Sequence, residues 1–328
     1  MRLWTDEGIS PINLGRQGAM NIVHYFRRMR FEDGGPVRAV IDLTDRLAGA
    51  GNAVRLVTTD DADVPPDRPR THGAEPFGSP GRPVRVFPID GATSVAGFLK
   101  TPALQTAGRI LEGADILHLH GAWDTSNLQF AKMARRMGIP YIVSPRGMLD
   151  DWCMAQRPLK KRVYHALVGK RFFEGAAGVH CTAEAELAQS KKWFPRGRGF
   201  VVPNLLDLTP YHDLPDVQVA RDAFPDLKTE DAVLLFLSRI HEKKGIELLI
   251  RATRVLKDRG MRVRTLIAGT GDKAYTESLQ RLASTEGVSD RVKFLGMVGG
   301  EAKLALYRDA DLFVLPTSQE NFGFVLPE

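Results

Sequence analysis

Two cations stand where an apolar run ends and a helical pattern begins. Arg239 and Lys244 lie in a short turn, residues 238–245, that follows the run at residues 233–238. In open α/β sheets, ligands bind beyond the carboxyl ends of the strands, so these cations are expected to point toward a ligand. A guanidinium fork and a compact ammonium together suit a diphosphate, although a solvated charge run has the same composition.

Two carboxylates, Glu320 and Glu328, lie eight positions apart after the last apolar run of the chain. Between them, Phe322 and Gly323 could present backbone N–H groups to a ligand, while the carboxylates accept hydrogen bonds from sugar hydroxyls. The alternative is that both are ordinary surface glutamates. The spacing of the two residues favours a ligand site over this alternative.

A glycine pair, Gly34 and Gly35, precedes Pro36 at the start of another helical pattern. Proline fits the first helical turn, and glycines let a ligand approach the backbone N–H groups at the positive end of the helix dipole. The turn could therefore bind an anion, although by itself the pattern favours an ordinary strand-to-helix turn.

Taken together, these motifs resemble the GT-B glycosyltransferases of family 4. The resemblance rests on Arg239 followed by Lys244-Gly245, the Glu-x7-Glu element at 320–328, the glycine pair, and the sequence His118-Leu-His120-Gly121. It covers the chain from about residue 20 to the end. It implies an α/β fold of two Rossmann-like domains that face a cleft, and retaining transfer of a sugar from a nucleotide diphosphate donor without a metal or another cofactor.

The resemblance also implies a role for each residue. Arg239 and Lys244 would hold the diphosphate, where fixed cations stabilise the charge that develops on the leaving group. Gly34 and Gly35 would lie against the phosphates. The other implied contacts are Glu320 with the donor-sugar hydroxyls, beside the backbone of Asn321, Phe322 and Gly323; Glu328 with the ribose; His120 near the donor sugar; and the backbone around Met297 and Val298 near the base.

The histidines His118 and His120 occupy the end of one apolar run. We expect them to project to opposite faces of the strand, so that only one can line the cleft. His120, which directly precedes Gly121, is the better candidate, with core packing as the alternative. No residue is identified as a general base.

These residues need parallel strands to position them. Short β-branched and aliphatic runs alternate with helical-period stretches, which predicts parallel sheets covered by helices. A proline- and aspartate-rich stretch at 204–224 predicts the linker between a domain at 20–205, the acceptor side, and a nucleotide-sugar domain at 206–328, after an extension at 1–19. The expected strands are residues 21–26, 53–58, 83–87, 115–119, 140–143, 178–181 and 200–202, followed by 233–238, 263–268, 291–295 and 312–315.

The composition excludes several classes of protein. The chain contains 45 Lys and Arg and 39 Asp and Glu. This excess of positive charge is too small and too dispersed for a nucleic-acid-binding protein. No apolar run approaches the roughly 18 residues of a membrane span. The two cysteines give neither a zinc spacing nor a disulfide framework, and the N-terminus lacks a secretory core, which predicts a cytoplasmic protein.

One basic segment, residues 157–173, contains six Lys and Arg, no acid, and apolar residues at helical spacing. Such helices bind anionic bilayers, where a lipid-linked acceptor would reside, so we expect peripheral contact with the inner face of a membrane. A helix half packed on its own domain, with a solvated basic face, is the alternative. Resemblance around residues 144–148 suggests cell-surface or exopolysaccharide assembly, with a sugar or lipid-linked acceptor.

Other interpretations stay open. The Asp-x-Asp patterns at 61–63 and 309–311 are interpreted as ordinary surface acids rather than metal ligands, and the glycines at 268–272 are misplaced for an NAD fingerprint. A sugar-nucleotide epimerase of the same fold is one alternative function. Because the family pattern continues past Glu328, the second domain is expected to be incomplete, and an inactive sugar-nucleotide-binding fragment is the other alternative.

Overall fold

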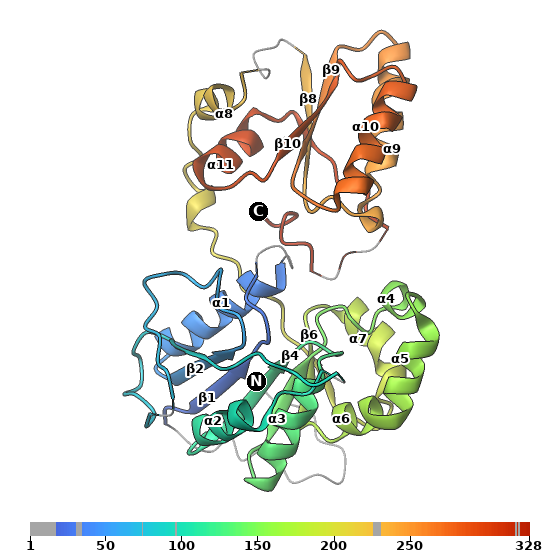
Figure 1. Cartoon of the computed structure of the whole chain (residues 1–328). Helices are drawn as coiled ribbons and strands as arrows, with labels where there is room; N and C mark the ends of the chain where they lie inside the picture. The colour runs from blue at the N-terminus through green and yellow to red at the C-terminus, as the bar shows by residue number, and fades with distance from the viewer. Residues whose placement is uncertain are drawn as a thin grey trace. The chain divides into compact units, whose positions relative to one another are not determined.

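The computed structural model describes residues 18–30, 35–73, 75–95, 97–225, 231–318, 320 and 322–328. The chain divides into two compact units, Met1–Leu205 and Leu206–Glu328, and each is built on one parallel sheet (Figure 1). The α/β prediction is therefore confirmed.

The first unit contains a seven-stranded sheet with the order β3-β2-β1-β4-β5-β6-β7. Each predicted strand is present, with its limits shifted by two residues or fewer. The order changes direction between β1 and β4, and ligands bind at such switch points, beyond the carboxyl ends of the strands. The strands are β1 (Asn21–Tyr25), β2 (Ala53–Thr58), β3 (Arg85–Pro88), β4 (Ile116–His120), β5 (Tyr141–Ser144), β6 (Gly178–Cys181) and β7 (Gly199–Val201).

Alternate residues of these strands build two cores. Val23 and Leu117 pack in a cluster with residues of α2 (Thr101–Leu111) and α3 (Thr125–Arg136), whereas Ile22 packs with α1 (Gly35–Gly49) on the other face. This is the period of two expected of a strand with both faces covered. The remaining helices of this unit are α4 (Asp151–Ala155), α5 (Pro158–Tyr164), the π-helical turn η2 (His165–Gly169), α6 (Lys170–Glu174), α7 (Glu184–Ser190) and η3 (Lys191–Trp193).

The second unit contains a four-stranded sheet with the order β10-β9-β8-β11. Its four predicted strands are likewise present: β8 (Ala232–Leu237), β9 (Val263–Ala268), β10 (Val292–Gly296) and β11 (Leu312–Phe313). Apolar residues of α9 and α10 cover one face, and those of α8 and α11 cover the other. The helices are η4 (Thr209–Tyr211), α8 (Val217–Ala223), η6 (Glu242–Lys244), α9 (Ile246–Asp258), α10 (Lys273–Thr285) and α11 (Gly300–Asp309).

Two expectations are corrected here. Most of the stretch predicted as a linker belongs to the second unit, because α8 lies within it and buries Ala220. Asp309 is not a surface acid: its side chain is 3% exposed and pairs with Arg221 at 2.8 Å, which joins α11 to α8. Asp311 accepts a 2.7 Å hydrogen bond from the backbone N–H of Val233. Both carboxylates therefore stabilise the sheet and its helices.

Candidate functional site

The loops that follow β8 and β9 are in backbone contact. The N–H of Ile240 donates to the carbonyl oxygen of Thr270 at 2.8 Å. A Cβ on Gly269 would lie 1.9 Å from the carbonyl oxygen of Ser238, and one on Gly271 would lie 1.9 Å from that of Ile240. The glycines after β9 are therefore required by loop packing, which accounts for them without a dinucleotide.

The loop after β11 is fastened to the turn that contains Lys244. Ser318 N–H and Thr317 Oγ1 donate to the carbonyl oxygen of Lys243 at 3.0 and 3.1 Å. Gly245, with φ +65°, lets this loop approach, because its Cβ would lie 2.2 Å from the Pro316 carbonyl oxygen. These contacts bring two predicted site residues, 76 positions apart, within reach of each other.

Lys244 and Glu320 form an ion pair in which the side chains are 13% and 20% exposed. Burial lowers the pKa of Lys244, and the hydrogen bond to Glu320 opposes that shift. Because ammonium and carboxylate are held together, the pair can exchange its internal contact for a phosphate and a hydroxyl of a ligand.

Glu328 lies in a second polar cluster. Its Oε2 accepts hydrogen bonds from Lys303 Nζ at 2.5 Å and from Tyr307 Oη at 3.0 Å, and its side chain is 2% exposed. Burial alone would raise the pKa of Glu328, but these hydrogen bonds and the charge of Lys303 bring it below its ordinary value. Sequence reasoning missed Lys303, because a lysine on an amphipathic helix carries no distinguishing signal.

The other predicted residues of this unit are spread over its loops. Arg239 is exposed after β8, and Met297, 67% exposed, follows β10. Val298 is half-buried against the core beneath α11. Phe322 contacts the ring of Phe324 edge to face. Gly323 has φ +65°, Gly35 is the first residue of α1, and Gly34 and Asn321 lie outside the described residues.

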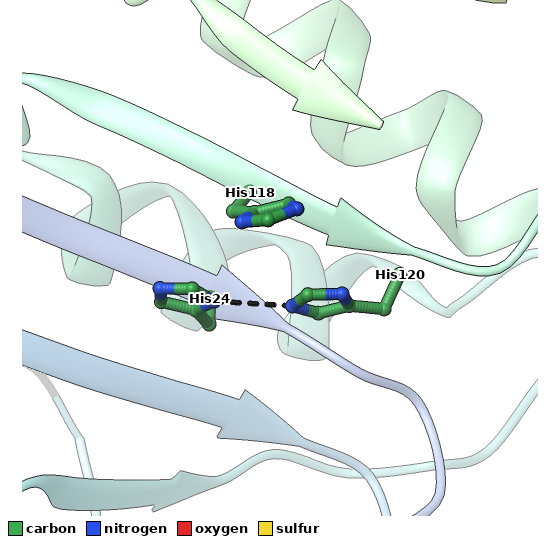
Figure 2. A group of neighbouring side chains, drawn as sticks. All are labelled: His24, His118 and His120. Atoms are coloured by element: carbon green, nitrogen blue, oxygen red, sulfur yellow. Dashed lines mark hydrogen bonds between the residues drawn. The ribbon is translucent and has the colours of Figure 1, made fainter. Parts of the chain in front are cut away.

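In the first unit, the expectation that His118 and His120 face opposite sides was wrong. Residues two apart in a strand share a face, and their ring centroids lie 4.3 Å apart. His24 of β1 projects to the same face, so the three buried imidazoles form one group (Figure 2). His24 was missed because its significance depends on β1 pairing with β4.

Two hydrogen-bonded chains cross this histidine group. Arg146 Nε donates to His120 Nδ1 at 3.3 Å, which places the proton of His120 on Nε2, and Nε2 then donates to His24 Nδ1 at 3.0 Å (Figure 2). His24 consequently carries its own proton on Nε2, an atom that has no partner among the described residues.

The second chain ends at a backbone carbonyl oxygen, which fixes its direction. His180 Nε2 donates to the Val202 oxygen at 2.8 Å, so His180 Nδ1 accepts from Ser144 Oγ at 2.8 Å. The serine oxygen in turn accepts from His118 Nε2 at 2.7 Å. For neutral imidazoles, these contacts define one tautomer for each histidine in the two chains.

A metal ion fits this group poorly. The nitrogens of His24, His118 and His120 lie within 4.8 Å of one another, and three imidazoles are a donor set that zinc accepts. A metal on His120 Nε2, however, would leave a proton on Nδ1, which faces the guanidinium N–H groups of Arg146. Metal-bound histidines normally donate that proton to an acceptor, so the group is better described as a hydrogen-bonded network.

Burial and charge keep these imidazoles neutral. Desolvation, together with the charge of Arg146, lowers the pKa of His24 to about 3 and the pKa values of His118 and His120 well below the ordinary value. Both nitrogens of the predicted site residue His120 are thus already hydrogen-bonded. Arg146, two residues after the end of β5, is the charged residue of the network, and sequence reasoning missed it.

Comparison with known proteins agrees with this architecture. The family model "Glycosyl transferase 4-like domain" matches residues 34–205, and "Glycosyl transferases group 1" matches residues 220–328. The structure resembles Anabaena Alr3699/HepE in complex with UDP and glucose, with a TM-score of 0.67 and 18% identity over 93% of this chain and 77% of that one. It also resembles WaaG, a glycosyltransferase involved in lipopolysaccharide biosynthesis, with a TM-score of 0.64 and 17% identity over 93% and 77%.

Two curated relatives match shorter stretches. The uncharacterized glycosyltransferase MJ1607 of Methanocaldococcus jannaschii is 37% identical over 31% of this chain, and the D-inositol 3-phosphate glycosyltransferase of Mycolicibacterium smegmatis is 35% identical over 46%. The matched stretches span 25% and 34% of those proteins. With one family model covering the first unit and another most of the second, the chain belongs to the GT-B glycosyltransferases of the group 1 and 4-like type.

Proposed function

We propose that the protein transfers a sugar, with retention, from a nucleotide diphosphate donor to a sugar or lipid-linked acceptor. The observation that carries the proposal is the half-buried Lys244–Glu320 pair, held at the carboxyl ends of β8 and β11 by backbone contacts. A lysine beside a carboxylate can accept a diphosphate oxygen while the carboxylate accepts a sugar hydroxyl. The UDP and glucose bound to the Anabaena protein support a donor of this class.

The chemistry follows from where charge develops. Cleavage of the sugar–phosphate bond places negative charge on the diphosphate and positive character on the ring, so a cation fixed at the phosphate stabilises the transition state more than the ground state. Lys244 and the exposed Arg239 would supply that charge, and we propose that no metal is needed for it. We also propose a role in cell-surface or exopolysaccharide assembly.

Lys244→Ala should weaken nucleotide diphosphate binding 10- to 100-fold, about 1.5–3 kcal/mol, because a charge-assisted hydrogen bond is lost. Isothermal titration of UDP, GDP and ADP measures the effect and identifies the base. Lys273→Ala, which truncates a lysine 92% exposed on α10, is the matched control and should bind normally. Equal affinities for the wild type and Lys244→Ala would contradict the assignment, and product analysis separates transfer from epimerisation.

The basic segment predicted from the sequence has an exposed apolar stripe. Leu159, Val163 and Leu167, spaced four residues apart, are 77%, 49% and 70% exposed. No helix among the described residues combines the length and apolarity needed to cross a membrane. We propose that the stripe lies in the interface of an anionic bilayer, where the flanking cations meet the headgroups. These exposed cations are Arg157, Lys160, Arg162, Lys170 and Arg171.

The double variant Leu159→Ser/Leu167→Ser should bind phosphatidylglycerol-containing vesicles at least 10-fold less tightly than the wild type, because two leucines lose their interfacial burial. Added salt should weaken wild-type binding, and neutral vesicles should bind less. Met137→Ser, at the C-cap of α3 and 41% exposed, is the control. Co-sedimentation that shows equal binding to neutral and anionic vesicles, or no effect of the double variant, would leave the segment a structural element.

A further inference from the structure

Arg146 carries a buried positive charge, and no carboxylate of the described residues lies at ion-pair distance from it. The residue is 8% exposed. Its Nε and Nη2 donate to His120 Nδ1 at 3.3 and 3.2 Å, and its Nη1 donates to Asn204 Oδ1 at 3.3 Å. Two neutral acceptors, both at the long end of the hydrogen-bond range, therefore serve a group with five N–H donors. Burying a charge in this way is costly unless an anion completes the site.

The carboxylate whose charge acts on Arg146, that of Glu186, accepts hydrogen bonds from other donors. Glu186 accepts from Gly147 N–H at 2.5 Å and from Thr182 N–H and Oγ1 at 2.6 and 2.9 Å. Its charge attracts Arg146 from a distance, but its oxygens hold the turn after β5. That turn places Arg146 in the left-handed region, at φ +51°. A non-glycine residue kept in this conformation is costly, and such strain persists where the surroundings or a function require the side chain's position.

The neighbouring histidines position Arg146 but cannot neutralise it. His120 presents the lone pair of Nδ1 to the guanidinium, because its proton lies on Nε2 and is given to His24. Burial lowers the pKa of Arg146 to about 10, which leaves the guanidinium charged at neutral pH. The network therefore consists of neutral imidazoles around one cation, the Arg146 guanidinium, at the carboxyl ends of β4 and β5.

We propose that Arg146 binds a phosphate group of the donor or the acceptor, with His120 as a positioning residue. The inference rests on the proposed function for its choice of phosphate, since substrates of such a reaction carry phosphates and a guanidinium binds them through two parallel N–H donors. The long contact to Asn204 is the one that an incoming phosphate oxygen replaces. Arg146 belongs to the first unit, whereas the Lys244–Glu320 pair belongs to the second.

The test is binding of sn-glycerol 3-phosphate and of UDP to the full chain, followed by calorimetry and thermal shift at constant ionic strength. Glycerol phosphate should bind the wild type and Arg136→Gln, an exposed arginine on α3, with equal affinity. Arg146→Gln should bind it at least 10-fold more weakly. Arg146→Lys keeps the charge but loses the two parallel N–H donors, so its loss of affinity for glycerol phosphate should be intermediate. This variant tests the inference if Arg146→Gln does not fold.

The two phosphate sources give different patterns. If the acceptor supplies the phosphate, the affinity for glycerol phosphate depends on Arg146 and the affinity for UDP does not. If the donor supplies the phosphate, the affinity for UDP falls in the Arg146 variants. This loss is additional to the loss in Lys244→Ala. Absence of binding by UDP, GDP and ADP alike, with intact, Arg146-dependent glycerol phosphate binding, would refute the proposed function and leave this inference standing. If folded Arg146 variants bind both ligands with wild-type affinity, the inference that Arg146 binds a phosphate is overturned.

Discussion

Replacing Gly245 with alanine should separate Lys244 from Glu320 and weaken nucleotide binding at least 10-fold. The new Cβ would lie 2.2 Å from the carbonyl oxygen of Pro316, a backbone atom that can move only with its loop. The left-handed φ of +65° adds about 1–2 kcal/mol of strain by itself. We expect a loss of unfolding free energy larger than that strain, together with at least the loss of affinity expected for Lys244→Ala. Urea unfolding and calorimetry with UDP measure the two effects.

Gly260→Ala separates backbone strain from steric overlap. Gly260 has a similar φ of +76°, but its Cβ would meet no atom within 4 Å. This variant should lose only the strain energy and should bind nucleotides normally. If both variants lose the same stability and Gly245→Ala keeps its nucleotide affinity, the contact with Pro316 does not position the ion pair.

Mild acid should destabilise the first unit strongly. The folded pKa values of His24, His118 and His120 lie below their ordinary value of 6.5, so the unfolded chain takes up protons before the folded chain does. Their contribution to stability is complete above about pH 6.5 and is lost as the pH falls toward the folded pKa values. Burial also lowers the pKa of His180, the fourth histidine of the network. Each histidine that stays neutral costs about 1.4 kcal/mol per pH unit, and four cost about 5.5 kcal/mol per unit, against a total of about 5–15 kcal/mol.

Urea unfolding at pH 7.5, 6.5, 5.5 and 5.0 tests this expectation. His24→Gln should reduce the slope of unfolding free energy against pH by about a quarter, because it removes one of the four buried histidines of the network whose pKa is lowered. His212→Gln replaces an exposed histidine of the second unit and should leave the slope unchanged. A stability that is constant between pH 7 and 5 would show that the network accepts protons in the folded state.

The sequence predicts those features of this protein that depend on periodicity. All eleven strands could be placed because parallel, buried strands are continuous apolar runs, and the proximity of Lys244 and Glu320 follows from both lying at carboxyl ends of strands. Arg146 could not be predicted, because its importance depends on burial, on a left-handed backbone and on a histidine from another strand. The error over His118 concerned the period of a strand, and the sequence itself contained the answer.

The π-helical turn η2 determines which residues of the basic segment can face outward together. An α-helix advances about 100° per residue, so an unbroken α-helix would place the buried Phe173 within about 40° of the exposed Leu159. The extra residue in the π-turn offsets everything downstream by about one such step, which separates the two sides. The segment therefore tolerates the loss of one residue better than the gain of one. Deletion of one residue between 165 and 169 would convert the π-turn into a regular α-helix and leave Phe173 buried, whereas insertion of one residue would turn Phe173 toward the stripe that is proposed to meet lipid.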